Sequence, residues 1–539
     1  MAIPKSNSIA QFVANVKANI QRYCAAKTRA HQGTFTDDNL TQLPYSPTTF
    51  VRMAAEARLP QVEYTTRTLD QEIDTVAICP SHPDYMIIGT YSLVKNDSQA
   101  SYVGQSRLGS LRVMTVSSTF KPSYAGMLPP ELDRIDLPCA VLDIHFHPED
   151  PTLLGVATSN ARVYFYRFVV HGDVLGRRVT TKLVPLGSVR VSDDDEHGLT
   201  PLVTQFTWFD EIRSTGPKGL GDVIIAALAA TTSFGEARLL KISVPAIRDL
   251  FDDRIGKEEV SILSSSEVVH KHDLEAWCIA SINFNTLKNT ETNDGGGQRL
   301  VLTGGDDSAL LASLITPSMP DWPPVQIDEE SINATQVWKD RRNHSAGVVA
   351  ILSLASPSTT MESNQSRPQT IPLLTGSYDE SVRIFEIDPT TYRGTLKTEL
   401  KLNGGVWRLK VLDEYTTNQN HGTNEYHYLL LASLMHAGAA IIRITYTTSS
   451  TGEVTWTIKP LTTFTAGHES MVYCCDARLE NPDASQQENA YDEAGNKLAR
   501  ADGMAAEPPT YTIVSTSFYD MKICTWKFVD EFKVHNQGK

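Results

Sequence analysis

The chain has 539 residues, of which 41% are hydrophobic, so it can bury a large core, and its formal net charge is -15. That charge argues against a nucleic-acid or anionic-membrane surface, because binding to phosphates depends on clustered lysines and arginines. The sequence has no apolar run of about 18 residues, no apolar signal-peptide core, and scattered cysteines of which only Cys474 and Cys475 are close together, so we expect a soluble, cytoplasmic chain with reduced thiols.

The N-terminal segment, residues 1–68, begins against this acidic balance, because no acidic residue precedes Asp37. Its early basic residues are Lys5, Lys17, Arg22, Lys27 and Arg29. An acid-poor start of this kind occurs in mitochondrial transit peptides, in surface helices and in disordered arms. We expect residues 1–68 to form an extension that is partly helical or disordered, and a targeting role stays open.

From about residue 70 onward, short runs of β-branched and aromatic residues alternate with turns of Gly, Asp, Ser and Pro, which is typical of an all-β chain. His272 precedes Asp307 of "TGGDDSALL" by 35 residues, and His344 precedes Asp379 of "TGSYDESVRIF" by 35 as well. A third copy runs from "GHES" to "STSFYDMKICTW" and is lengthened by a polar insert at about 480–509. The equal spacing indicates one repeated unit.

This pattern of a histidine, a strand pair, a tight turn with Asp and a closing strand resembles the WD-repeat β-propeller, in which each repeat is a four-stranded blade. The repeats that we count begin near residues 75, 139, 204, 272, 344, 404 and 468. In two early blades, Ser92 and Asn160 stand where the turn Asp is expected, and the third blade shows no clear turn residue. We predict an all-β fold, a seven-bladed WD-repeat β-propeller at 69–530, with a C-terminal tail at 531–539.

Several short segments, in this order, resemble the WD-repeat diphthine methyl esterase family of diphthamide biosynthesis. They are "HDLEAW" (272–277), "LTGGDDSALL" (302–311), "LLTGSYDESVRIFE" (from 373), "GGVWRLK" (404–410), "LLASLMHAG" (430–438), "HESMVY" (468–473) and "STSFYD" (515–520). The resemblance covers about residues 70–528 and is specific over 270–526.

The resemblance implies a carboxylic ester hydrolase that removes the methyl ester from methylated diphthine on translation elongation factor 2. The protein substrate would be elongation factor 2, and the reaction needs no cofactor. A rival interpretation is a non-catalytic WD-repeat scaffold that presents a protein to a separate enzyme, because propellers serve in both roles.

Ester hydrolysis needs an activated nucleophile, a proton acceptor and donors for the oxyanion. The chain has no G-x-S-x-G nucleophile elbow, so a histidine or carboxylate that activates water is the simpler expectation. His145 and His147 of "DIHFHP" are more typical of a blade turn than of a metal site, and we expect no metal.

His436 is the leading candidate for the base. In register, it replaces Asp379 of the preceding repeat, and its own repeat has "GGVWR" in place of the leading histidine. A histidine released from the structural pair can act as a general base near neutral pH, or it can simply be a substituted turn residue. Glu469 and Arg408 are the further catalytic candidates, as a carboxylate and as an oxyanion donor.

The remaining repeat histidines, His272, His344 and His468, are expected to be structural. Three aromatic residues occupy matching positions near the start of their repeats, namely Trp277, Trp407 and Tyr473. In an acidic protein they could bind a trimethylammonium group by cation–π attraction, or they could pack between blades. We assign them as substrate-binding candidates.

Overall fold

The computed structural model describes residues 62–94, 106–116, 131–172, 179–210, 212–215, 223–245, 259–284, 298–316, 333–357, 370–419, 423–449, 453–480 and 508–533. The chain divides into two compact units, Met1–Gln61 and Val62–Lys539, and all described residues belong to the second. Nearly all of the predicted N-terminal extension and most of the polar insert at 480–509 lie outside the described residues. Among the described residues, no helix is long and apolar enough to cross a membrane.

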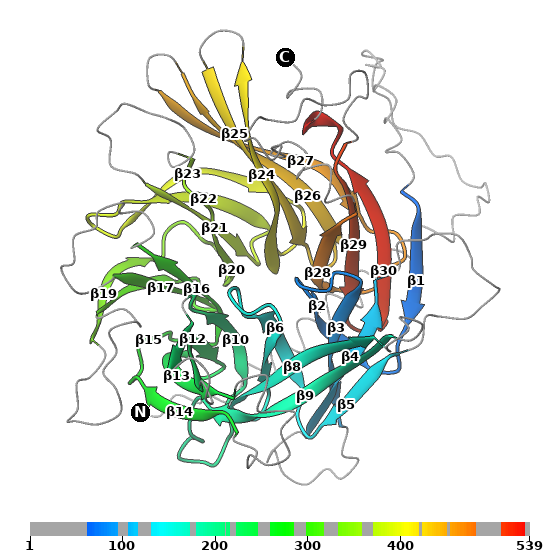
Figure 1. The fold of residues 1–539 in the computed structure, drawn as a ribbon. Helices are drawn as coiled ribbons and strands as arrows, with labels where there is room; N and C mark the ends of the chain where they lie inside the picture. Colours follow the sequence, from blue (N-terminus) through cyan, green and yellow to red (C-terminus); the bar gives the residue numbers. More distant parts are fainter. Residues whose placement is uncertain are drawn as a thin grey trace, which may run out of the picture. The chain divides into compact units, whose positions relative to one another are not determined.

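The second unit is a seven-bladed β-propeller, as predicted, with seven antiparallel sheets around one axis (Figure 1). Blade 1 contains β2 (Glu72–Ile78), β3 (Tyr85–Leu93), β4 (Arg107–Thr115) and β5 (Asp133–Leu137), and blade 2 contains β6 (Val141–Phe146), β7 (Leu153–Thr158), β8 (Arg162–Gly172) and β9 (Val179–Arg190). Blade 3 contains β10 (Val203–Trp208), β12 (Val223–Thr232), β13 (Glu236–Val244) and β14 (Ser261–Ser265), with the short strands β11 (Arg213–Thr215) and β15 (His270–Lys271) beside them.

The later blades are more regular in sequence. Blade 4 contains β16 (Ala276–Asn283), β17 (Arg299–Gly305), β18 (Leu310–Thr316) and β19 (Asn333–Asp340), and blade 5 contains β20 (Val348–Ser353), β21 (Ile371–Ser377), β22 (Ser381–Ile387) and β23 (Gly394–Lys401). Blade 6 contains β24 (Arg408–Gln419), β25 (Thr423–Ser433), β26 (Ala439–Thr448) and β27 (Val454–Phe464), and blade 7 contains β28 (Val472–Leu479), β29 (Thr510–Ser517) and β30 (Lys522–Val529).

The seventh blade takes its fourth strand from the start of the unit. β1 (Tyr64–Thr68) pairs antiparallel with β30, so the two ends of the propeller share one sheet and close the ring. The predicted extension, residues 1–68, includes these residues, so the propeller begins earlier than the predicted residue 69. An isolated edge strand is hard to recognise from sequence, because its hydrogen-bonding partner lies at the other end of the chain.

The other predicted boundary also shifts. Residues 531–533 of the predicted tail lie against blade 6, where the Phe532 ring is 5.3 Å from that of His427 and Lys533 forms an ion pair with Asp413 at 2.9 Å. The remainder of the tail, 534–539, lies outside the described residues.

Each interface between neighbouring blades has its own hydrophobic cluster, and the described residues form seven such clusters. Phe165 and Phe206 belong to the cluster between blades 2 and 3, and Phe464 and Trp526 belong to the cluster between blades 6 and 7. Because both faces of most blades are covered, their central strands are apolar on both sides rather than alternating.

The first strands surround the axis, and β2, β6, β10, β16, β20, β24 and β28 contact one another in a closed sequence. In six of them the ladder shifts by one residue near the start of the strand, which is a β-bulge. In blade 6 the equivalent residue is Trp407, whose amide donates to the Ser433 carbonyl just before β24 begins. We name these seven positions the bulge ring: Asp74, Leu142, Thr204, Trp277, Val349, Trp407 and Tyr473.

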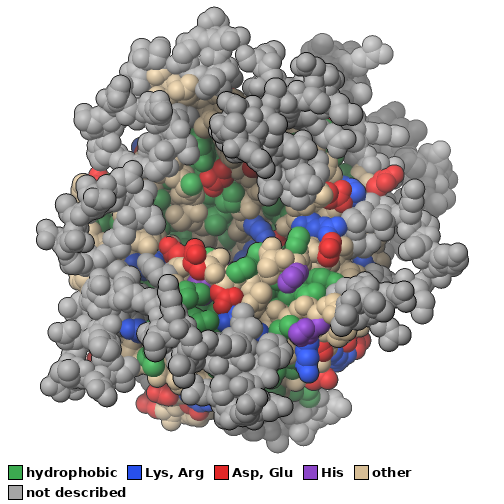
Figure 2. Space-filling model, viewed as in Figure 1, with side chains coloured by type: hydrophobic (Ala, Val, Ile, Leu, Met, Phe, Trp, Pro, Cys, Tyr) green, Lys and Arg blue, Asp and Glu red, His purple; other side chains and the backbone are tan. Residues whose placement is uncertain are grey.

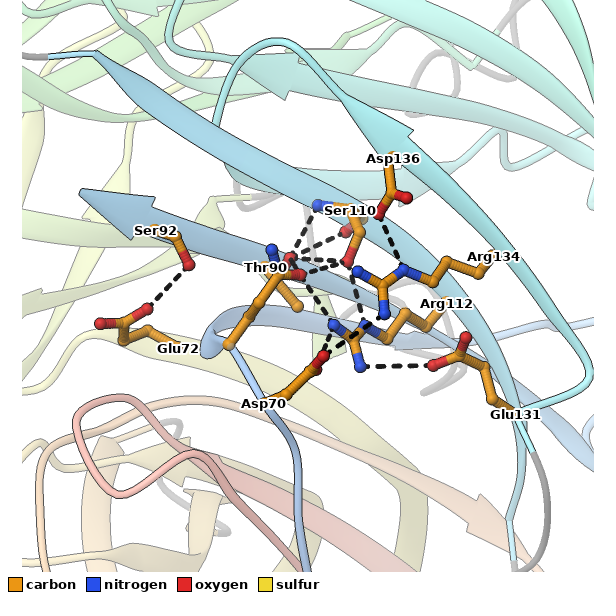
Figure 3. Close-up of polar contacts among 10 residues, drawn as sticks. Asp70, Glu72, Thr90, Ser92, Ser110, Arg112, Glu131, Arg134 and Asp136 are labelled. Atoms are coloured by element: carbon orange, nitrogen blue, oxygen red, sulfur yellow. Dashed lines mark hydrogen bonds and ion pairs between the residues drawn. The ribbon is translucent and has the colours of Figure 1, made fainter. Parts of the chain in front are cut away.

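The turns of blades 1 and 2 differ from the Asp-containing turns of the later blades. Ser92 is not a turn residue, contrary to the prediction; it lies inside β3 and donates to Glu72 (Figure 3). Blade 1 instead uses the buried Arg112, which contacts Asp70 at 2.5 Å and Ser110 at 3.0 Å. Asn160 does lie in the turn of blade 2, where it accepts a hydrogen bond from Thr158 at 2.6 Å.

Candidate functional site at the channel mouth

Three aromatic side chains of the bulge ring meet at one end of the channel. The ring centroids of Trp277 (blade 4) and Trp407 (blade 6) are 5.6 Å apart although blade 5 lies between them, so both side chains project toward the axis. Trp407 in turn lies 5.0 Å from Tyr473 of blade 7. The structure thus brings the three predicted substrate-binding residues together, and we name Trp277, Trp407 and Tyr473 the aromatic arc.

Two further aromatic residues, which the sequence analysis missed, extend the aromatic arc. The Tyr378 ring is 5.7 Å from Trp407, and the Phe518 ring is 5.4 Å from Tyr473. Both lie in the turns that carry the repeat Asp, directly after the end of the preceding strand. Comparing the neighbours of the turn Asp between repeats, rather than the Asp alone, could have revealed them.

Arg408 lies against Trp407 of the aromatic arc. Its guanidinium sits 5.3 Å from the Trp407 ring and donates to the Val349 and Trp407 carbonyls at 3.3 and 3.1 Å. It also reaches from blade 6 across the channel to Asp143 of blade 2, at 3.9 Å. A planar cation with donors on two edges can bind a further oxygen atom in this position.

Two half-buried carboxyls also belong to the mouth, and neither was predicted. Asp74 is the blade 1 member of the bulge ring, and Asp306 lies in the turn of blade 4. Burial raises the pKa of Asp74 to about 7, against the opposing effect of Arg408, and burial likewise raises the pKa of Asp306 to about 7, against the opposing effect of Trp277. Carboxyls with pKa values so far above the ordinary range are characteristic of functional sites.

The sequence did contain a signal for Asp74. When the first strands are aligned on their bulges, Asp74 falls in the column of Trp277, Trp407 and Tyr473. Without a leading histidine in blade 1, the sequence gives no anchor for that alignment. Figure 2 shows acidic, basic and histidine side chains around the centre of the ring on the face in view.

The repeat histidines are structural, as predicted. His272 bonds the turn carboxylate of Asp307 at 2.9 Å and Thr303 at 2.8 Å. Burial lowers the pKa of His344 and of His468 to about 4, so both rings are neutral at physiological pH. These buried groups hold the blades together and are not available to a substrate.

The turn that carries His436 differs in backbone from its counterparts. In five blades the residue that corresponds to Glu380 has a positive φ, for example 70° at Glu380 and 59° at Ser308, whereas blade 6 has its positive φ values at Met435 (50°) and Gly438 (82°). Met435 exchanges two backbone hydrogen bonds with Val472 of blade 7, at 3.1 and 2.9 Å. His436 is exposed on this rebuilt turn.

The glycines of "GGVWR" explain how blade 6 manages without a histidine. A Cβ atom on Gly404 would overlap the Leu434 carbonyl oxygen and would lie 2.6 Å from the Cβ of Ala437. The turn backbone therefore packs directly on the loop where other blades place a histidine and an Asp. In blade 6 a close backbone contact at Gly404 thus replaces the contact between the leading histidine and the turn Asp. The His436 side chain is left at the surface.

The other candidates have contacts of their own. The Glu469 side chain is 71% exposed and pairs with Lys522 at 2.8 Å. His145 bonds Asp143 at 2.8 Å, and His147 packs on Trp208 with ring centroids 4.9 Å apart. Among the described residues, no group of three or more His, Cys, Asp or Glu side chains could hold a metal ion.

Comparison with known proteins gives one curated relative of note. The chain is 24% identical over 394 residues to the diphthine methyltransferase of Schizosaccharomyces pombe, which covers 73% of this chain and 80% of the relative. No protein-family model matches the chain. Similar solved structures include Sqt1 of Chaetomium thermophilum bound to the N-terminus of ribosomal protein L10 (12% identity, TM-score 0.38, 83% of this chain and 85% of that one) and Sqt1 of Saccharomyces cerevisiae (12%, 0.38, 87% and 98%).

Proposed function

We propose that this propeller is a cytoplasmic hydrolase of diphthamide biosynthesis, which removes the carboxyl methyl ester from methylated diphthine on translation elongation factor 2. The observation that carries the proposal is the channel mouth, where the aromatic arc, two high-pKa carboxyls and Arg408 converge. The similarity to a diphthine methyltransferase supports the same pathway.

The mouth suits a substrate that carries a quaternary ammonium beside an ester. A trimethylammonium group cannot donate a hydrogen bond, so aromatic faces attract it more selectively than polar groups do. Trp277, Trp407 and Tyr473 supply such faces, and the Asp306 carboxyl next to Trp277 would add negative charge where a bound cation favours its ionised form.

Arg408 supplies the electrophilic half of the reaction. Its guanidinium lies against Trp407, so an ester bound beside the ammonium has a donor for its carbonyl oxygen. A donor aimed at the developing oxyanion lowers the barrier to acyl transfer. His436 and Glu469, both exposed, are the proton acceptors that the sequence suggests.

Methanol release from ester-bearing elongation factor 2 tests this function. The purified protein alone should release methanol and leave the free carboxylate, and added S-adenosylmethionine should make no difference. Methyl incorporation from S-adenosylmethionine would identify a transferase instead. Stable binding of elongation factor 2 without turnover would identify the scaffold.

A further inference from the structure

Asp74 occupies a distinctive place in the bulge ring. It comes from β2 of blade 1, next in the ring to Tyr473 of blade 7, and so continues the aromatic arc with a carboxyl. Its carboxyl forms no hydrogen bond with any described residue, although it is half-buried within the ring. A carboxyl that is partly removed from water and makes no hydrogen bond lowers the stability of the fold. Such unfavourable features are found mainly at functional sites.

The charged and titratable groups that face Asp74 come from four other strands and one turn. They are Arg408 of β24, Asp143 of β6, Tyr91 of β3, Tyr473 of β28 and Tyr519 of the blade 7 turn. Arg408 is the one cation in this set. Arg408, which would bind the ester oxygen, is therefore also the positive charge that acts on Asp74.

The two neighbouring carboxyls, Asp143 and Asp306, have different surroundings from Asp74. Asp143 contacts His145 at 2.8 Å and accepts from the Phe206 amide at 3.4 Å, and although burial acts in the opposite direction, His145 holds its pKa below the usual range. Asp306 presses against Gly347, and one of its oxygens is fully buried. Asp143 is therefore already paired with His145, and the Asp306 carboxyl faces Trp277 and two other acidic residues, whereas Asp74 faces Arg408.

Resting on the proposed function, we propose that Asp74 is the proton acceptor for the water molecule that attacks the ester carbonyl, with Arg408 as the donor to the oxyanion. Asp306 lies instead beside Trp277, where a bound ammonium would favour its ionised form. Asp74 would then take the role that the sequence suggested for the exposed His436 and Glu469, from a position next to the aromatic arc.

The reaction balances without a further reactant. Water forms a bond to the carbonyl carbon while one of its protons passes to the Asp74 carboxylate, and Arg408 stabilises the negative oxygen of the tetrahedral intermediate. The intermediate then breaks its bond to the methoxy oxygen, which takes the proton from Asp74 and leaves as methanol. The new carboxyl group ionises, so one proton is released to solvent for each ester hydrolysed.

The carboxyl is suited to this role because burial raises its pKa to about 7, where a general base is both available and strong at neutral pH. An ordinary aspartate would be a weaker base.

The test compares kcat and KM for methanol release by the wild-type protein and by Asp74→Asn, with ester-bearing elongation factor 2. We expect kcat to fall on the order of 10²- to 10⁴-fold with KM nearly unchanged, because the isosteric amide cannot accept the proton. The matched control is Asp136→Asn, which removes a carboxylate that is 71% exposed on β5 and should leave both constants unchanged. In Asp306→Asn the KM should rise while kcat is largely retained.

Three results would overturn the assignment. Wild-type turnover in Asp74→Asn would exclude it while leaving the proposed function intact. So would a loss of kcat in His436→Ala or Glu469→Gln that Asp74→Asn does not share. Absence of methanol release by the wild-type protein would remove the proposed function and this inference together.

Discussion

Trp407 holds the centre of the aromatic arc, since its ring contacts those of Trp277, Tyr473 and Tyr378. We predict that Trp407→Ala raises KM for the ester substrate about 2- to 30-fold, which corresponds to one cation–π contact of about 0.5 to 2 kcal/mol. Trp407→Phe keeps an aromatic face and should raise KM less than the alanine variant. Equal KM values for the alanine variant and the parent would show that the aromatic arc packs between blades and does not bind the substrate.

Asp74 should also leave a signature in stability that is independent of activity. Its pKa in the folded chain, about 7, is above the unfolded value, so the folded state holds a proton that the unfolded state has lost between about pH 4 and pH 7. The wild-type protein therefore loses stability as pH rises through this window. We predict that Asp74→Asn raises Tm at pH 8 but not at pH 4, as calorimetry at the two pH values would measure.

A lower Tm at both pH values would indicate a structural role for Asp74. If Asp74→Asn lowered Tm at both pH values, the carboxyl would contribute to the fold through contacts of its own, and its loss of turnover could not be assigned to proton transfer.

The turns of blades 5 and 6 are held in place by different contacts, a carboxylate in blade 5 and a glycine in blade 6. Asp379 accepts from the Ser345 and Ser381 amides at 3.0 and 3.1 Å and from Arg383 at 2.9 Å. Asp379→Ala leaves these donors unsatisfied, so we predict a loss of about 1 to 3 kcal/mol in the free energy of unfolding, measured by denaturant titration.

In blade 6 the turn is held instead by the close approach of Gly404 to the Leu434 carbonyl. Gly404→Ala places a methyl group against the Leu434 carbonyl, so we predict a loss of about 1 to 3 kcal/mol in the free energy of unfolding and a displaced His436 turn. The control is Gly172→Ala, where nothing lies within 4 Å and no loss is expected. Equal stability of the two variants would show that the turn does not depend on this close approach.

The elements also show where sequence reasoning succeeded and where it failed. Blades 4, 5 and 7 were predictable because a local pair, such as His272 and Asp307, marks both ends of the repeat. Blade 1 stabilises the same region with Arg112 and Asp70, which leave no recurrent spacing, and Ser92 was misplaced for that reason. The aromatic arc followed from position within the repeat, whereas Asp74 needed the bulge register, which only strand pairing supplies.

At the scale of the whole propeller, closure depends on β1. It supplies the outer strand of blade 7 by pairing with β30, although the two are separated by nearly the full length of the unit. We predict that a chain that begins at residue 70 has a lower Tm than a chain that begins at residue 62 and aggregates, because the edge of β30 is exposed. Thermal unfolding and light scattering would compare the two truncations.

In the proposed mechanism, water attacks the acyl carbon of a methyl ester at the channel mouth, so the water oxygen should be found in the new carboxylate. Ester-bearing elongation factor 2 would be incubated with the wild-type protein in water enriched in heavy oxygen, and both products would be examined by mass spectrometry. The mechanism predicts one heavy oxygen atom in the protein carboxylate and none in the methanol. Heavy oxygen in the methanol alone, or recovery of the ester unchanged, would contradict it.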